Sequence, residues 1–287
     1  MAADKDILNF FAKFIEAQTG IAYSEVTFYQ LESRLEAIAV QLGHGTIPKL
    51  AEIAQKSGIQ GPMKELLIDV ATNNETSFFR DTKLFTTLAQ EVLPAMMQAH
   101  SGRSFRIWSA ASSTGQEVYS LAMILSELQS QYPEARWEMV ASDISERVLA
   151  KASSGRYTQL EIQRGLNAQR LLSYFDQIED EGNGAIWKIK PHLQQKITFR
   201  RLNLIEPWPA SLGKFDLILC RNVLIYQTVE QKKRVLQQIA QRLNPGCRLI
   251  LGGAESLIGL SEDYDQEQIS GSIFYRLKSP TPMIQAS

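Results

Sequence analysis

Two carboxylates, Glu117 and Asp143, lie where a strand-like segment gives way to a helical one, a place where a ligand could meet them. Glu117 falls in the first turn of a helical segment, 115–131, which comes soon after the strand-like run 105–110. The connection holds small residues and one glycine, Gly115, where a dinucleotide fold has a glycine-rich turn for a pyrophosphate. Negative charge at a helix N-terminus opposes a phosphate and suits a cationic ligand, but it also complements the helix dipole. Both roles stay open for Glu117 at this point.

Asp143 ends the second strand-like run, 136–143, and a helical segment follows it at 145–155. A carboxylate at the C-terminal end of such a strand can accept hydrogen bonds from both hydroxyls of a ribose. Taken alone, a helix-capping role is the commoner one for Asp at this position. Asp143 and the loop before Glu117, taken together, indicate a nucleoside ligand with positive charge and no diphosphate. S-adenosylmethionine fits that description better than NAD.

A third polar cluster follows the apolar run "FDLILC" (215–220). Arg221 and Asn222 come directly after it, and Tyr226 follows four residues later. Site residues concentrate at the C-terminal ends of buried strands in open α/β sheets, so we expect these three to join the same site. The alternative is an Asn that caps a helix beside an Arg that lies at the surface.

The stretch "TNNETSFFRD" (72–81) gathers amides, hydroxyls, an acid, an arginine and two adjacent phenylalanines just before a helical pattern. Asp81 or Thr82 can cap that helix, whose apolar face would be Phe85, Leu88, Val92 and Met96. Helix capping explains the choice of Asp81, but it does not explain the polar residues that precede it. The stretch is therefore a candidate part of the binding site.

The elements that must position these residues form two regions. The first hundred residues have helical periodicity throughout, as in Phe28, Leu31, Leu35 and Ile38. From 105 onward, strand-like and helical runs alternate, which predicts an α/β fold with a doubly wound parallel sheet. We expect a helical domain at 1–73 and a ligand-binding domain at 74–287, with a linker and helix at 74–104.

The segment 156–195 is less regular than the rest of the second region. It favours a helix near 161–173 and a short strand at Trp187–Lys190.

Composition excludes several classes of protein. The net charge is -1 and the first hundred residues hold more acids than bases, which disfavours nucleic acid. Cys220 and Cys247 lie in apolar runs and suit free thiols in a reducing compartment. No apolar run reaches the roughly 20 residues that a membrane span needs, and the N-terminus has no signal-peptide pattern, so we expect a cytoplasmic protein.

His44, His100 and His192 lie outside the motifs, which leaves a nicotinamide dehydrogenase without a candidate hydride-transfer histidine. We expect no metal site.

Taken together, the motifs resemble the CheR family, the methyltransferases of chemotaxis receptors. The resemblance covers nearly the whole chain, because six motifs occur in the order and at about the spacing of the family: "TNNETSFFRD", "RIWSAASSTGQEVYS", "ASDIS", "RRLNL", "FDLILCRNVLIY" and "GGAESL". It implies a Rossmann-like class I S-adenosylmethionine-dependent methyltransferase sheet with a small all-helical N-terminal domain. Some members of the family also have a small β-subdomain, and the segment near 180–200 could form one. It also implies a protein-glutamate O-methyltransferase that gives glutamate γ-methyl esters and S-adenosylhomocysteine.

The same resemblance assigns residues to roles. Arg80 and Tyr226 are implied to be catalytic, with Tyr226 near the transferred methyl group. Phe78 and Phe79 would anchor the 72–81 stretch over the cofactor. The implied cofactor contacts are Asn74, Thr76, Arg80, Glu117, Asp143, Asn203, Leu204, Arg221 and Asn222.

The implied partners are the cytoplasmic helices of methyl-accepting chemoreceptors, and we expect a monomer that binds neither nucleic acid nor the membrane interior. The sequence departs from the family on the second N-terminal helix, where members often carry several basic residues and only Arg34 is present. Arg34 is thus the candidate for substrate docking, and the basic residues that could replace the missing ones are Arg164, Arg170, Lys188, Lys190, Arg200 and Arg201. Two alternatives remain: a methyltransferase with another substrate, and a non-catalytic module that senses the cofactor and docks on receptors.

Overall fold

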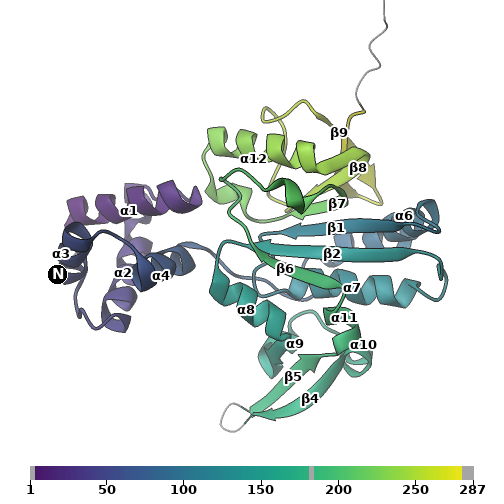
Figure 1. Ribbon diagram of the computed structural model, residues 1–287, viewed down its shortest axis with the longest axis horizontal. Coiled ribbons are helices and arrows are strands. Elements are labelled where there is room, and N and C mark those ends of the chain that lie inside the picture. The colour runs from purple at the N-terminus through teal and green to yellow at the C-terminus, as the bar shows by residue number, and fades with distance from the viewer. Residues whose placement is uncertain (1–3, 181–183, 280–287) are drawn as a thin grey trace, which may run out of the picture.

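A helical N-terminal domain, a seven-stranded sheet with flanking helices and a small three-stranded sheet make up the molecule (Figure 1). The computed structural model describes residues 4–180 and 184–279. None of the helices within these residues is long and apolar enough to cross a membrane.

The N-terminal domain consists of α1 (Lys5–Thr19), α2 (Phe28–Gln41), α3 (Ile47–Ser57) and α4 (Gly61–Ala71), with a short 3-10 turn at Glu25–Thr27. The predicted periodicity of α2 is confirmed, because Phe28, Leu31, Leu35 and Ile38 are all buried. They belong to a core that only these four helices build, and the two faces of the large sheet have cores of their own.

The large sheet has the strand order β6-β2-β1-β7-β8-β10-β9. Its parallel part is β1 (Ser104–Ala110), β2 (Arg136–Asp143), β6 (Ile197–Arg201), β7 (Phe215–Cys220) and β8 (Leu243–Leu251). An antiparallel hairpin, β9 (Tyr264–Ile269) and β10 (Ser272–Leu277), completes one edge. The predicted doubly wound α/β fold is confirmed. The strand order reverses between β1 and β7, the place where such sheets bind ligands.

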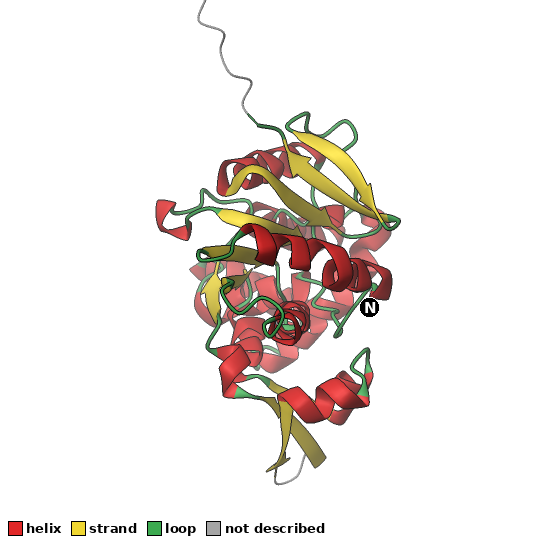
Figure 2. Ribbon diagram, turned by 90° about the vertical axis from the view of Figure 1, so that its right-hand side faces the viewer, coloured by secondary structure: helices red, strands yellow, loops and turns green. Residues whose placement is uncertain are grey.

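Helices cover both faces of this sheet (Figure 2). One face packs on α7 (Gln116–Leu128) and on the helices that precede β1, and the opposite face packs on α12 (Val229–Arg242). α8 (Glu146–Ser154) connects β2 to the small sheet. Two short 3-10 turns, Ala210–Leu212 and Leu224–Tyr226, flank β7.

The helix predicted after Asp81 forms in three pieces. They are α5 (Thr82–Thr87), a π turn at Leu88–Val92 and α6 (Leu93–Ala99). Pro94 has no backbone N–H to donate, and a local change of helical pitch accommodates that loss. The predicted apolar face of Phe85, Leu88, Val92 and Met96 is nevertheless buried, and Asp81 caps α5 by accepting from the Leu84 N–H.

The small sheet has the order β3-β5-β4 and lies beside the main body in both views (Figures 1 and 2). Its strands are β3 (Arg156–Thr158), β4 (Phe175–Asp180) and β5 (Gly184–Ile189), with α9 (Gln159–Gln163), α10 (Ala168–Tyr174) and α11 (Pro191–Gln194) alongside. The sequence suggested a β-subdomain near 180–200. The sheet instead spans 156–189, and 197–201 is β6 of the large sheet.

The single helix predicted near 161–173 is wrong, because α9 and α10 are separate. Gly165 divides them with a φ of +95°, and a Cβ there would lie 1.9 Å from the carbonyl oxygen of Phe78. Only glycine tolerates both the backbone angle and the contact. The glycine at this break therefore allows residues 72–81 to pack against the segment.

Candidate active site

A cavity of about 940 Å³, including its open mouth, lies at the C-terminal ends of β1, β2, β6 and β7. The loops after these strands line it, together with residues 72–81, hereafter the strap, and the end of α1. All ten residues that the sequence assigned to cofactor or catalysis border this one cavity: Asn74, Thr76, Arg80, Glu117, Asp143, Asn203, Leu204, Arg221, Asn222 and Tyr226.

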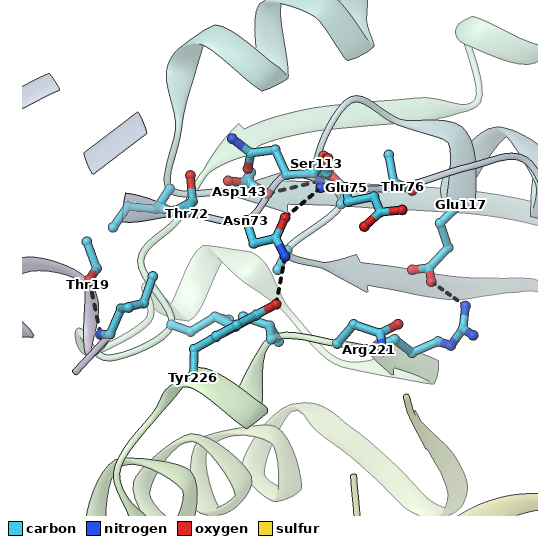
Figure 3. Close-up of a pocket in the computed structure, with 18 of the residues that line it drawn as sticks. Thr19, Thr72, Asn73, Glu75, Thr76, Ser113, Glu117, Asp143, Arg221 and Tyr226 are labelled. Atoms are coloured by element: carbon cyan, nitrogen blue, oxygen red, sulfur yellow. Dashed lines mark hydrogen bonds and ion pairs between the residues drawn. The ribbon is translucent and has the colours of Figure 1, made fainter. Parts of the chain in front are cut away.

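The loop after β1 forms one wall of the cavity (Figure 3). Ala111 and Ser113 hold left-handed backbone angles, with φ of +57° and +50°, which non-glycine residues rarely adopt. The N–H of Ser113 donates to Asp143 Oδ2 at 2.9 Å, and its Oγ donates to the carbonyl of Asn74 at 2.7 Å. The strained loop is thus fixed both to β2 and to the strap.

Asp143 is buried at the end of β2, and the Ser145 N–H donates to its Oδ1 at 3.1 Å. Burial raises the pKa of Asp143, and the backbone N–H groups of Ser145, Ser113 and Ile144 oppose that rise because they favour the ionised form. An ionised carboxylate has about four acceptor positions, so capacity remains for two ligand hydroxyls.

Glu117 and Arg221 form a largely buried ion pair at 2.9 Å, which joins α7 to the end of β7 (Figure 3). Glu117 also accepts from Ser109 Oγ at 2.7 Å. Arg221 donates to the carbonyl of Arg80 at 3.3 Å and lies 3.5 Å from Asp81. The alternative of a surface arginine is therefore wrong, because only 4% of the Arg221 side chain is exposed. Glu117 acts within this pair and does more than complement the dipole of α7.

The strap is anchored through its two phenylalanines, as the sequence predicted. Phe78 packs edge-on against Tyr157 and Phe175, with ring centroids 5.1 and 5.6 Å apart. The buried Phe79 has a φ of +51°, and its N–H donates to Ser120 Oγ at 2.9 Å. These contacts fix the last third of the strap and leave its first residues over the cavity.

Arg80 turns back on the strap itself. Its Nη1 donates to the carbonyl of Glu75 at 2.9 Å, and the Glu75 carboxylate pairs with Arg164 at 2.9 Å. The guanidinium is thereby placed at the border of the cavity, and no carboxylate of residues 4–180 and 184–279 forms an ion pair with it.

Tyr226 lies at the mouth of the cavity, where Asn73 Nδ2 donates to its hydroxyl at 2.8 Å (Figure 3). Asn73 Oδ1 accepts from the Glu75 N–H at 3.4 Å, which fixes the orientation of the amide. Sequence reasoning missed Asn73, although it lies within the strap that drew attention.

Contributions from α1 were also missed. Thr19 and Ile21 line the cavity, and the Ala22 N–H donates to the carbonyl of Tyr226 at 3.4 Å. Asn203 Nδ2 donates to the carbonyl of Gln18 at 2.8 Å. No local pattern in 18–22 indicates a ligand, so only the packing of the two domains brings this segment to the site.

Arg34 does not project from α2 as a docking residue would. Its Nη1 donates to the hydroxyl of Tyr23 and, at 3.2 Å, to the carbonyl of Ala71 at the end of α4. These contacts lie inside the N-terminal domain, and the docking role of Arg34 stays a prediction.

Most of the proposed basic substitutes are also occupied. Arg170 makes a two-pronged contact with Glu127, and Arg201 pairs with Glu65 and Glu146. Lys190 donates to two backbone carbonyls. Arg164 pairs with Glu75, as described above. Within the described residues, Lys188 and Arg200 make no hydrogen bond or ion pair of this kind.

The cavity fits a polar, positively charged nucleoside ligand. Three buried side-chain atoms on its wall, Ser112 Oγ, Arg221 Nε and Gln227 Oε1, have no hydrogen-bond partner among the residues that the structure describes. Such orphaned atoms are expected where a ligand completes the bonding. Three carboxylates and two guanidinium groups line the cavity, which leaves an excess of negative charge. No cluster suited to a metal ion exists in 4–180 and 184–279.

Comparison with known proteins agrees with this geometry. The family model described as "CheR methyltransferase, SAM binding domain" matches residues 74–273. Chemotaxis protein methyltransferase 1 of Pseudomonas aeruginosa is 40% identical over 97% of this chain and 100% of its own length. Chemotaxis protein methyltransferase Cher2 of Pseudomonas putida is 39% identical over 93% of this chain and 96% of its own, and a chemotaxis protein methyltransferase of Vibrio parahaemolyticus is 40% identical over 93% and 95%. The chain thus belongs to the CheR methyltransferase family and is an S-adenosylmethionine-dependent methyltransferase.

Proposed function

We propose that this enzyme methylates glutamate side chains on the cytoplasmic helices of chemoreceptors, giving γ-methyl esters. The names of its relatives support this acceptor. The observation in the molecule that carries it is the hydroxyl of Tyr226. Because that oxygen accepts from Asn73, the hydroxyl proton remains free to donate to an acceptor at the cavity mouth, and a carboxylate is such an acceptor.

Glutamate suits a site without a dedicated base. Its reference pKa of about 4.3 leaves it ionised at pH 7, so the carboxylate is already the nucleophile. S-adenosylmethionine, when bound, supplies an electrophilic methyl group on its sulfonium sulfur. The carboxylate oxygen takes this methyl group in line as the sulfur–carbon bond breaks, and the rest of the cofactor is released as S-adenosylhomocysteine. The protein must supply alignment and exclude water.

Each wall of the cavity has a part in this task. Asp143 would hold the two ribose hydroxyls, and the Glu117–Arg221 pair would face the charged amino-acid end of the cofactor. The strap would cover the cofactor and keep water out.

Arg80 and Tyr226 would orient the acceptor carboxylate. Charge is neutralised as the methyl group moves, so a tight ion pair to the acceptor would stabilise the starting state more than the transition state. The attachment of Arg80 to the Glu75 carbonyl keeps the guanidinium at the border, where it can orient the acceptor without clamping it.

The N-terminal domain would present the receptor-docking surface. The exposed apolar residues Val26, Tyr29 and Val40 lie on or beside α2, which lacks the basic row of other members. Arg34 would serve that surface indirectly, by joining α2 to the end of α4. Docking of this kind depends little on salt, because apolar burial is not screened.

The test is methyl transfer from labelled S-adenosylmethionine to membranes that carry receptors, with the methyl groups then released by base and their positions mapped. We expect base-labile label on receptor glutamates. Tyr226→Phe should lower turnover while cofactor affinity in calorimetry stays near normal. Label on another class of molecule would overturn the acceptor, and cofactor binding without any transfer would favour a non-catalytic docking module.

A further inference from the structure

Glu255 makes an unusual set of contacts outside the cavity. Its Oε2 accepts from the N–H groups of Asn222 at 2.8 Å and Gly252 at 2.7 Å. Its Oε1 accepts from those of Val223 at 3.0 Å and Ile225 at 3.2 Å. One carboxylate thus holds four backbone donors, three of which lie in the turn that follows β7. Charge-assisted bonds of this type are about twice as strong as neutral ones.

That turn, residues 222–226, carries two of the site residues, Asn222 and Tyr226. Asn222 has a φ of +58°, which a non-glycine residue holds only when its surroundings enforce it. The turn supplies few backbone acceptors of its own, since its internal bond is Tyr226 N–H to the Val223 carbonyl at 3.3 Å. Without Glu255, the N–H groups of residues 222, 223 and 225 would lose the partner that defines their direction.

Gly252 provides a second, independent indication that this packing is built in. A Cβ on Gly252 would lie 2.6 Å from Asn222 Nδ2, 2.8 Å from Asn222 N and 2.8 Å from Glu255 Oε2. Only a glycine lets the turn approach the end of β8 this closely. Gly252 and Glu255 belong to the motif "GGAESL", which contains none of the residues assigned above to cofactor binding or catalysis.

We propose that Glu255 is a positioning residue, which sets the place of Asn222 against the cofactor and of Tyr226 against the acceptor by holding the N–H groups of the 222–226 turn. The Tyr226 half of this proposal rests on the proposed function. The Asn222 half does not, because cofactor affinity is measured without an acceptor.

The decisive variant is Glu255→Gln, which keeps the shape but replaces one carboxylate oxygen by an amide NH2 group that faces two N–H donors. We expect both cofactor affinity and turnover at saturating cofactor to fall by about tenfold or more, the scale of losing charge-assisted hydrogen bonds. Gly252→Ala should act in the same direction. Glu262→Gln, an exposed carboxylate on the same loop, is the matched control and should change neither quantity.

Chemical rescue separates positioning from a general loss of stability. Glu255→Ala opens a space for a small carboxylate, so added formate should restore cofactor affinity and turnover in a concentration-dependent way. Formate should not stimulate the unchanged enzyme or Tyr226→Phe. If Glu255→Gln leaves both quantities unchanged, or if formate fails to rescue a folded Glu255→Ala, the proposal is overturned. Receptor labelling by the unchanged enzyme reports on the proposed function separately.

Discussion

The two walls of the cavity are built differently. The sheet wall, formed by the loops after β1, β2 and β7, places buried side chains such as Asp143 and Arg221 in several hydrogen bonds each. The strap has exposed residues at its start, Asn73 and Glu75, which make single polar contacts with Tyr226 and Arg164, and two buried phenylalanines at its far end. A wall of the first kind is pre-formed before ligand arrives, whereas one of the second kind can open locally at small free-energy cost.

The largest expected difference between the walls is in stability. Arg221→Met would leave the Glu117 carboxylate buried and uncompensated, which lowers the free energy of unfolding by about 3–5 kcal/mol. Arg164→Ala breaks the exposed pair with Glu75 on the strap, where both side chains are more than half exposed, and should have no measurable effect. Denaturant unfolding compares the two. Equal losses would contradict the contrast between the walls.

Cofactor affinity should depend more on the sheet wall. Asp143→Ala should weaken S-adenosylmethionine binding by about 1–3 kcal/mol, the scale of losing hydrogen bonds to a charged group. Calorimetry gives the change directly. Unchanged affinity would remove the ribose assignment of Asp143.

The pH dependence of binding sharpens the same point. Burial raises the pKa of Asp143 above the ordinary value of 3.8. Its ionisation therefore lowers folding stability as pH rises from 3.8 through the raised pKa, because the unfolded chain has already released that proton. Binding has the opposite sign, since ribose hydroxyls need the ionised carboxylate. We expect affinity to fall as pH is lowered through the raised pKa, and Asp143→Asn to flatten that fall. An unchanged pH profile in this variant would assign the dependence to another group.

The smallest effect is expected on the strap. Asn73→Ala removes the donor to the Tyr226 hydroxyl and should lower turnover severalfold, corresponding to about 1 kcal/mol for one neutral hydrogen bond. Cofactor affinity should stay close to that of the unchanged enzyme. Steady-state kinetics at saturating cofactor measures the change, and unchanged turnover would show that the Asn73 hydrogen bond does not help to place the Tyr226 hydroxyl.

Part of the candidate site could be predicted from the residues themselves because it follows strands, and strand ends meet at one edge of a parallel sheet; Asn74, Thr76, Asn203 and Leu204 came from the family resemblance. Asp143 and Arg221 could be placed on that edge from β2 and β7 alone. Asn73 and Ile21 could not, because their position depends on how the N-terminal domain packs on the sheet. The partners of Arg34 escaped for a related reason: the Ala71 carbonyl that occupies it belongs to another helix of the same domain.

By itself, the sequence determined the alternation of strands and helices, the order of the motifs and the family, since these depend on local periodicity and residue type. Only the tertiary structure decided that Glu117 and Arg221 neutralise each other and that Tyr226 accepts from Asn73. It also decided that Glu255 holds the N–H groups of the 222–226 turn. The partners in each case are far apart along the chain, and a hydrogen bond or ion pair depends on distance and direction, which no local pattern encodes.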